Sequence, residues 1–219
     1  GKNKGVKVYE GRENRIVFLG MDQARDELLY SDVKGRNPFK DRRVREAMYR
    51  LIDVHAINKA VMRGLSVPSA INLPNPTRAG IPGEMDKRYP YDVAAAKKLL
   101  AEAGYPSGFE VTIDCPNNRY INDEKICVAV AGMVAKGGIR MKVNAMPRAQ
   151  YFQKVQKLDT SMYMLGWGGA VTDAETTLTP VMRNLGQGGI GSYNYGRSTN
   201  AKFDDLAARS SVEADPAKR

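Results

Sequence analysis

The sequence predicts an α/β domain, in which helices flank a mixed sheet that contains a βαβ unit. Residues 109–115 and 139–145 each alternate apolar and polar side chains, which is the period of a half-buried strand. The segment between them carries apolar residues at helical spacing and ends at Gly137-Gly138. Strand, helix and strand within about forty residues indicate two parallel strands joined by a crossover helix.

The residues before this unit predict one strand and three helices. The apolar run 15–21 is typical of a buried strand. Asp41, Asp53 and Asp92 each precede a segment with helical apolar spacing, and we expect their carboxylates to cap these helices. Residues 65–90 contain five prolines and predict a long irregular segment, a kind of loop that is often functional.

The pattern continues on the far side of the unit. It predicts a helix near 148–157, a strand at 161–165 and a helix over 174–183. Asn122 stands at the start of the crossover helix, and its side chain is expected to cap that helix.

Two loops are candidates for a ligand site, because open α/β sheets bind ligands beyond the carboxyl ends of their strands. They are residues 115–122 and 166–173. The candidate ligand-binding residues in these loops are Asn117, Arg119, Tyr120, Trp167, Gly168, Gly169 and Asp173.

Each of these residues has a functional and a purely structural interpretation. Glycines beside Trp167 allow something to approach the backbone closely, and an indole offers a broad apolar contact with one N–H donor. Trp167 could instead be a core side chain, and Asp173 could be a plain helix cap. Arg119 and Tyr120 could offer charge and aromatic surface to a ligand, or could only pack and be solvated at the sheet edge.

Three motifs that suggest catalysis or cofactor binding fail on context. Gly186–Gly191 fits the spelling G-x-G-x-x-G but follows a predicted helix and leads into turns, so a dinucleotide site is rejected. Ser31 and Lys34 form a loose S-x-x-K pattern without its companion motifs. His55 near a helix start has no nucleophile setting around it. No catalytic residue and no cofactor are predicted.

Composition narrows the function further. The net charge of +10 comes from basic residues scattered along the chain, and the densest run, 40–45, fits a solvated helix face, so nucleic-acid binding is not expected. The ligand inventory of Cys115, Cys127 and His55 excludes most zinc and iron–sulfur sites. The two cysteines could form a disulfide or remain free thiols, and their spacing does not decide between these.

The chain carries no apolar run near the roughly 20 residues of a membrane-spanning helix, so membrane insertion is not expected. It opens on residues 1–4, Gly-Lys-Asn-Lys, and closes on residues 213–219, a proline-led helix start. We therefore expect a piece of a longer protein, truncated at both ends.

Several motifs together resemble the extracellular solute-binding proteins of dipeptide, oligopeptide and nickel ABC importers. The resemblance runs over residues 15–219 in family order. The segments that carry it are 37–47 (Asn-Pro-Phe-Lys-Asp-Arg-Arg-Val-Arg-Glu-Ala), 99–109, 115–123, 137–139, 165–168 (Leu-Gly-Trp-Gly) and 194–200 (Asn-Tyr-Gly-Arg-Ser-Thr-Asn).

The resemblance implies a two-lobed periplasmic protein that encloses a small-molecule or peptide ligand between its lobes and delivers it to permease subunits. Residues 1–219 would form the second lobe, and the whole protein would be a monomer without catalysis or cofactor. In that compartment a disulfide between Cys115 and Cys127 becomes the favoured state, worth about 3 kcal/mol on the chain-entropy model.

One departure from the family concerns the ligand. Peptide-binding members that resemble this chain carry an aspartate three residues after the tryptophan, where it pairs with the α-amino group of the peptide. Here that position is Ala170, and the nearest acid is Asp173. We expect ordinary dipeptides not to be anchored in the usual way, which leaves a peptide derivative, an opine, a sugar or a metal chelate open. A hydrolase using His55 or Ser31 is the rival from another class.

Overall fold

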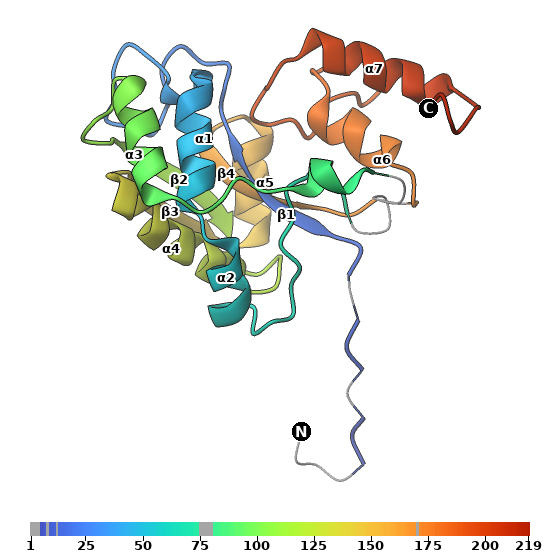
Figure 1. Ribbon diagram of the computed structural model, residues 1–219, viewed down its shortest axis with the longest axis horizontal. Helices are drawn as coiled ribbons and strands as arrows, with labels where there is room; N and C mark the ends of the chain where they lie inside the picture. Colours follow the sequence, from blue (N-terminus) through green and yellow to red (C-terminus); the bar gives the residue numbers. More distant parts are fainter. Residues whose placement is uncertain (1–4, 8, 12, 75–80, 170) are drawn as a thin grey trace.

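Four strands form one mixed sheet at the centre of the molecule. The computed structural model describes residues 5–219 except 8, 12, 75–80 and 170. The strands are β1 (Ile16–Met21), β2 (Glu110–Pro116), β3 (Arg140–Met146) and β4 (Met162–Trp167), and their order in the sheet is β1-β4-β2-β3. β2 runs parallel to both β3 and β4, whereas β1 is antiparallel to β4 (Figure 1). The predicted α/β class with a parallel βαβ unit is confirmed.

The helices α1 to α5 begin where the sequence predicts, and three of the caps act as expected. The longer helices are α1 (Arg42–Leu51), α2 (Val54–Ala60), α3 (Val93–Glu102), α4 (Asp123–Val134), α5 (Arg148–Gln156) and α7 (Ala201–Val212). The shorter turns are η1 (Pro38–Lys40), η3 (Gly83–Asp86), η4 (Ala135–Gly137), α6 (Glu175–Thr177) and η5 (Leu178–Met182). The carboxylates of Asp41, Asp53 and Asp92 accept backbone N–H groups at the starts of α1, α2 and α3.

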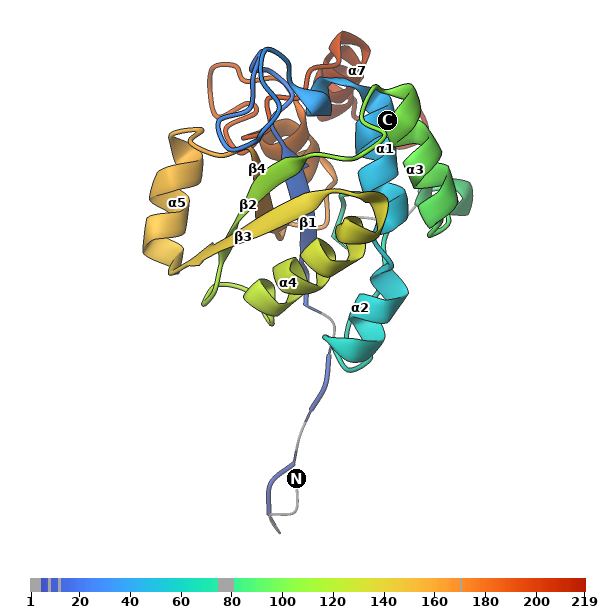
Figure 2. The same cartoon turned by 90° about the vertical axis from the view of Figure 1, so that its left-hand side faces the viewer.

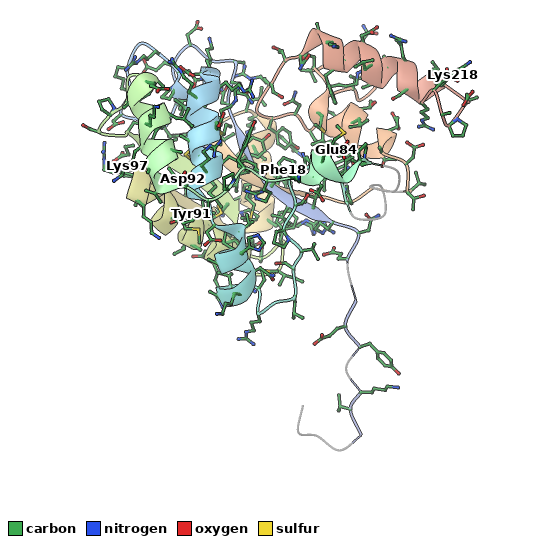
Figure 3. All side chains as sticks on the ribbon, in the orientation of Figure 1. Phe18, Glu84, Tyr91, Asp92, Lys97 and Lys218 are labelled. Atoms are coloured by element: carbon green, nitrogen blue, oxygen red, sulfur yellow. A yellow bond between two sulfur atoms is a disulfide. The ribbon has the colours of Figure 1, made fainter. Side chains whose placement is uncertain are left out.

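Helices cover both faces of the sheet (Figure 2). On one face α1, α3 and α4 pack over Val111, Ile113 and Met164, which belong to the larger hydrophobic core. On the other face α5 places Tyr151 and Val155 against Tyr163 and Leu165 of β4. The amphipathic pattern of α3 matches its packing. Leu100 is buried in the larger core, and Lys97 on the same helix is exposed (Figure 3).

The last quarter of the chain differs from the sequence prediction. The predicted helix over 174–183 is instead the single turn α6 followed by the π-helical turn η5. No helix was predicted after Asn200, yet α7 begins there, and the Asn200 side chain accepts the N–H of Phe203. α7 lies beside α6 and η5, away from α3 and α4 (Figure 1). No helix in the described part of the chain is long and apolar enough to cross a membrane.

Candidate functional site

The two predicted loops leave the same edge of the sheet. β2 and β4 are parallel neighbours, so their carboxyl ends lie together, and antiparallel β1 begins at that edge with Ile16 opposite Trp167. We call this region the carboxyl edge and define it by Asn14, Arg15, Arg119, Tyr120 and Trp167. Five residues from three separate parts of the sequence are thus brought to one place.

The loop after β2 is held by its own residues. A disulfide joins Cys115, near the end of β2, to Cys127 in the second turn of α4, and both side chains are fully buried. The buried carboxylate of Asp123 accepts the backbone N–H groups of Arg119 and Tyr120, each at 2.9 Å, and that of Glu124 at 3.0 Å. These bonds fix the backbone that presents Arg119 and Tyr120.

The predicted capping role of Asn122 is wrong. Asn122 adopts a left-handed conformation with φ of 56°, and its side chain makes no capping bond to α4. Its amide instead donates to the carbonyl of Val61, which ties the loop to the end of α2. Asp123, one residue later, organises the turn because its carboxylate is buried against the amides.

Tyr120 connects the two loops. Its ring lies over Gly166, where an added Cβ would come within 2.5 Å of the ring, and its hydroxyl donates to the Gly166 carbonyl at 3.3 Å. The guanidinium groups of Arg119 and Arg15 lie 5.0 Å and 5.6 Å from the centre of this ring. Tyr120 is therefore a packing residue of the edge that carries two cations beside it.

Arg119 is the side chain with the fewest internal commitments at the edge. It is half-buried, and no carboxylate among the described residues forms an ion pair with it. Asn117, in the same loop, is exposed, and its backbone N–H donates to the Met146 carbonyl at the end of β3.

Trp167 is half-buried, and its polar atom is already used. Its Nε1–H donates to the carbonyl of Thr176 at 3.0 Å, and its ring lies 4.7 Å from that of Tyr193. Tyr193 in turn contacts Tyr195, whose pKa is raised to about 12 by burial, so that this phenol stays neutral at physiological pH. The indole can therefore offer a ligand apolar surface, but not the free N–H donor expected from the sequence.

The glycines after Trp167 are explained by a contact inside the chain. A Cβ at Gly168 would lie 2.4 Å from the backbone oxygen of Asn14, and the Asn14 side chain donates to the Gly169 carbonyl at 2.9 Å. Close approach does occur here, as the glycines predict, and the segment that approaches is the one leading into β1. Ala170 lies outside the described residues.

Asp173 makes a contact of the kind that the sequence offered as an alternative, although Ala174 occupies the N-cap position of α6. Its Oδ1 accepts the N–H of Glu175 at the start of α6, and its carboxylate pairs with Arg219 at 2.6 Å. A contact between Asp173 and a ligand stays a prediction.

The residues set aside as catalytic candidates also have structural environments. The Ser31 hydroxyl donates to the Glu110 carbonyl, and His55 is exposed in the first turn of α2. Residues 186–191 form turns and lead into further turns, without a following helix at their end. No group of three or more potential metal ligands occurs among the described residues.

Sequence reasoning missed Asn14, Arg15 and Tyr193. Arg15 and Asn14 reach the edge only because β1 is antiparallel to β4, which no local pattern reveals. Tyr193 had a usable signal, since the cluster Tyr193-Asn-Tyr195 in a glycine-flanked turn concentrates aromatic surface.

The structure is thus a mixed sheet whose strand ends carry an edge of aromatic and cationic side chains. The chain belongs to the bacterial extracellular solute-binding proteins of family 5, whose middle region matches residues 1–189.

The chain is similar to several individual proteins. The chain is 33% identical to heme-binding protein A of Haemophilus influenzae over 175 residues, which cover 77% of this chain and 30% of the relative. It is 28% identical to the glutathione-binding protein GsiB of Shigella flexneri over 223 residues, covering 100% of this chain and 41% of the relative.

The fold is also similar to that of a solved structure. The ABC transporter-associated periplasmic binding protein DppA of Helicobacter pylori, in complex with the peptide STSA, superposes with a TM-score of 0.74 at 25% identity and covers 94% of this chain and 39% of that one. The chain thus spans less than half the length of these three proteins.

Proposed function

We propose that the chain is the second lobe of a periplasmic solute-binding protein that captures a peptide-like or other small polar solute for an ABC importer. The rest of the longer protein would supply the opposite wall of the binding cleft. Family membership and relatives that bind heme, glutathione and a peptide support this proposal. Capture without catalysis fits a site built from packed aromatic rings and cations.

The observation that carries the proposal is the composition of the carboxyl edge. Trp167 offers ring surface there, and Arg119 offers a guanidinium that no carboxylate of the described chain neutralises. A planar guanidinium with free donors favours a carboxylate or another anionic group. Heme, glutathione and peptides all carry carboxylates, so an anionic group on the solute is the shared chemistry. We therefore assign Arg119 as its anchor.

The test is solute capture by the full-length protein. Native mass spectrometry of protein purified from its source would find a retained anionic solute, and calorimetry would measure its affinity. Arg119→Gln should weaken binding about tenfold or more, because a charge-assisted pair at a half-buried site is lost. Arg209→Gln is the matched control, since Arg209 is exposed on α7 and, among the residues that the structure describes, pairs only with Asp205. Equal affinities of the two variants would reject the anchor.

A panel of free dipeptides addresses the ligand class. Ala170 offers no carboxylate to an α-amino group. Dipeptides with a free amine should therefore bind no more tightly than the same dipeptides with an acetylated amine. Nanomolar binding that requires a free amine would contradict this expectation. The isolated 219-residue chain should bind any of these solutes more weakly than the full-length protein, because one wall of the cleft is missing.

A further inference from the structure

An apolar hollow of about 350 Å³ adjoins the carboxyl edge on the face of the sheet that carries α2 and α4. Leu19 of β1, Met164 of β4 and Val130 of α4 form its floor, and Met164 and Val130 are buried. Ile57 of α2 and residues 65–69 of the irregular segment form its far wall. The functional site described above does not use this space, although Tyr120 and Arg15 border both.

Exposed apolar side chains lie on the rim of the hollow. Val17, Leu65, Val67 and Ile121 all line it, with exposed fractions of 37%, 66%, 55% and 68%. Apolar side chains that gather around an apolar concavity mark a place where another apolar group is bound. At roughly 30 Å³ for each group the size of a water molecule, the space takes on the order of a dozen non-hydrogen atoms.

Two cations border the hollow, and they differ in how fully they are engaged. Arg88 donates to the Ser69 carbonyl at 2.7 Å and stacks on the Tyr49 ring at 4.0 Å, so it holds the irregular segment in place. Arg15 holds Glu13 through its Nε, and no acceptor among the described residues takes its terminal nitrogens. Arg15 thus presents donors at the junction between the hollow and the carboxyl edge.

We propose that the hollow is a subsite for an apolar group of the captured solute, and that Arg15 binds an anionic group next to it. The solute is then an amphiphilic anion, with an alkyl or aromatic part of roughly a dozen atoms. This inference rests on the proposed function and names its ligand class. Continuity supports it, because Arg15 and Tyr120 belong to the carboxyl edge and also line the hollow, so that one ligand can contact both places.

The experiment uses 8-anilinonaphthalene-1-sulfonate, an aromatic anion that fluoresces in apolar surroundings, with decanoate and decanol as competitors. The full-length protein and the 219-residue chain should each bind one equivalent of the dye, and decanoate should displace it better than decanol. Val67→Asp puts a charge on the rim and should weaken dye binding about tenfold. Leu206→Asp, on exposed α7, is the control and should leave binding within about twofold.

Arg15→Gln separates the anionic contact from general stability. It should remove the preference for decanoate over decanol and leave decanol binding unchanged, because an alcohol makes no charge-assisted bond. A merely structural role of Arg15 would weaken both competitors alike and would overturn this part of the proposal.

Two results would overturn the subsite itself. One is equal dye binding by Val67→Asp and Leu206→Asp. The other is dye binding by the 219-residue chain but not by the full-length protein, since the rest of the polypeptide would then cover the hollow. The proposed function fails separately: it is lost if the full-length protein captures no solute, whereas capture that depends on Arg119 and ignores Val67→Asp removes the hollow alone.

Discussion

The two loops of the carboxyl edge are held in opposite ways. The loop after β2 is fixed by neighbours in sequence: the disulfide spans 12 positions, and Asp123 binds amides one, three and four residues away. The loop after β4 is fixed from a distance, because Asn14 lies 155 positions before Gly169 and Arg219 lies 46 positions after Asp173. We call the loop after β2 the self-contained loop, because its own neighbours in sequence hold it. We call the loop after β4 the dependent loop, because distant segments hold it.

This difference assigns different tasks to the two loops. A loop whose backbone is fixed before a ligand arrives loses little conformational freedom on binding, and it presents Arg119 in one orientation. A loop held by remote segments responds to whatever moves those segments. Residues leading into β1 hold Gly168 and Gly169, so a change in the path of the chain before Ile16 would reach Trp167 directly. Four tests sharpen or break the contrast.

Removing the disulfide should have the largest effect on stability. Cys115→Ala with Cys127→Ala releases the end of β2 from α4, and the chain-entropy relation for a loop of this size gives about 3 kcal/mol. Urea unfolding of the double variant, beside the unmodified chain with and without reductant, measures it. The reduced chain and the double variant should agree to within about 1 kcal/mol. A cost below about 1 kcal/mol would mean that Asp123 alone fixes the loop.

Asp123→Ala should come next, at about 2–3 kcal/mol, because the buried Tyr120 amide and two others lose a charged acceptor. Asp123→Asn keeps one side-chain oxygen as an acceptor and should lose less stability. Hydrogen exchange at the Arg119 and Tyr120 amides reports the effect locally. If exchange at these amides stays slow in Asp123→Ala, the loop is not organised by this carboxylate.

The self-contained loop was also the part of the site that could be predicted from the sequence. The alternation before Cys115 gives strand β2, and the residues beyond it must leave at its carboxyl end. Within that loop the error was small: Asn122 was expected to cap α4, and the buried carboxylate one residue later organises the turn instead.

The dependent loop could not be predicted in the same way. Its glycines indicated a close approach, but the partner, Asn14, follows from the antiparallel pairing of β1 with β4, which is a long-range property. The same limit applies to α7. Asn200 is a good cap residue, yet the helix has one buried side chain, Ala207, and hence a weak apolar pattern.

The third test compares two glycine substitutions, one in the dependent loop and one in α4. Gly168→Ala places a Cβ against the Asn14 backbone oxygen and should cost about 1–3 kcal/mol, because one of two backbone segments must move. Gly132→Ala is the control: this glycine lies exposed inside α4 with open space at its Cβ, and alanine should stabilise by about 0.5–1 kcal/mol. Fluorescence of Trp167, the single tryptophan, should change in Gly168→Ala alone. Unchanged emission would show that Asn14 does not set the position of the indole.

The smallest effect is expected at the far tether of the same loop. Arg219 and Asp173 are each about one-third exposed, at 35% and 38% of the side chain, so Arg219→Ala should cost less than about 0.5 kcal/mol and less still in high salt. Asp173→Ala should still cost about 1 kcal/mol in high salt, since it removes the acceptor for the Glu175 amide as well as the ion pair. Urea unfolding at two salt concentrations separates these contributions. If both variants lose the same stability and respond equally to salt, the ion pair and not the cap secures this end of the loop, and the dependence on remote segments extends to the last residue of the chain.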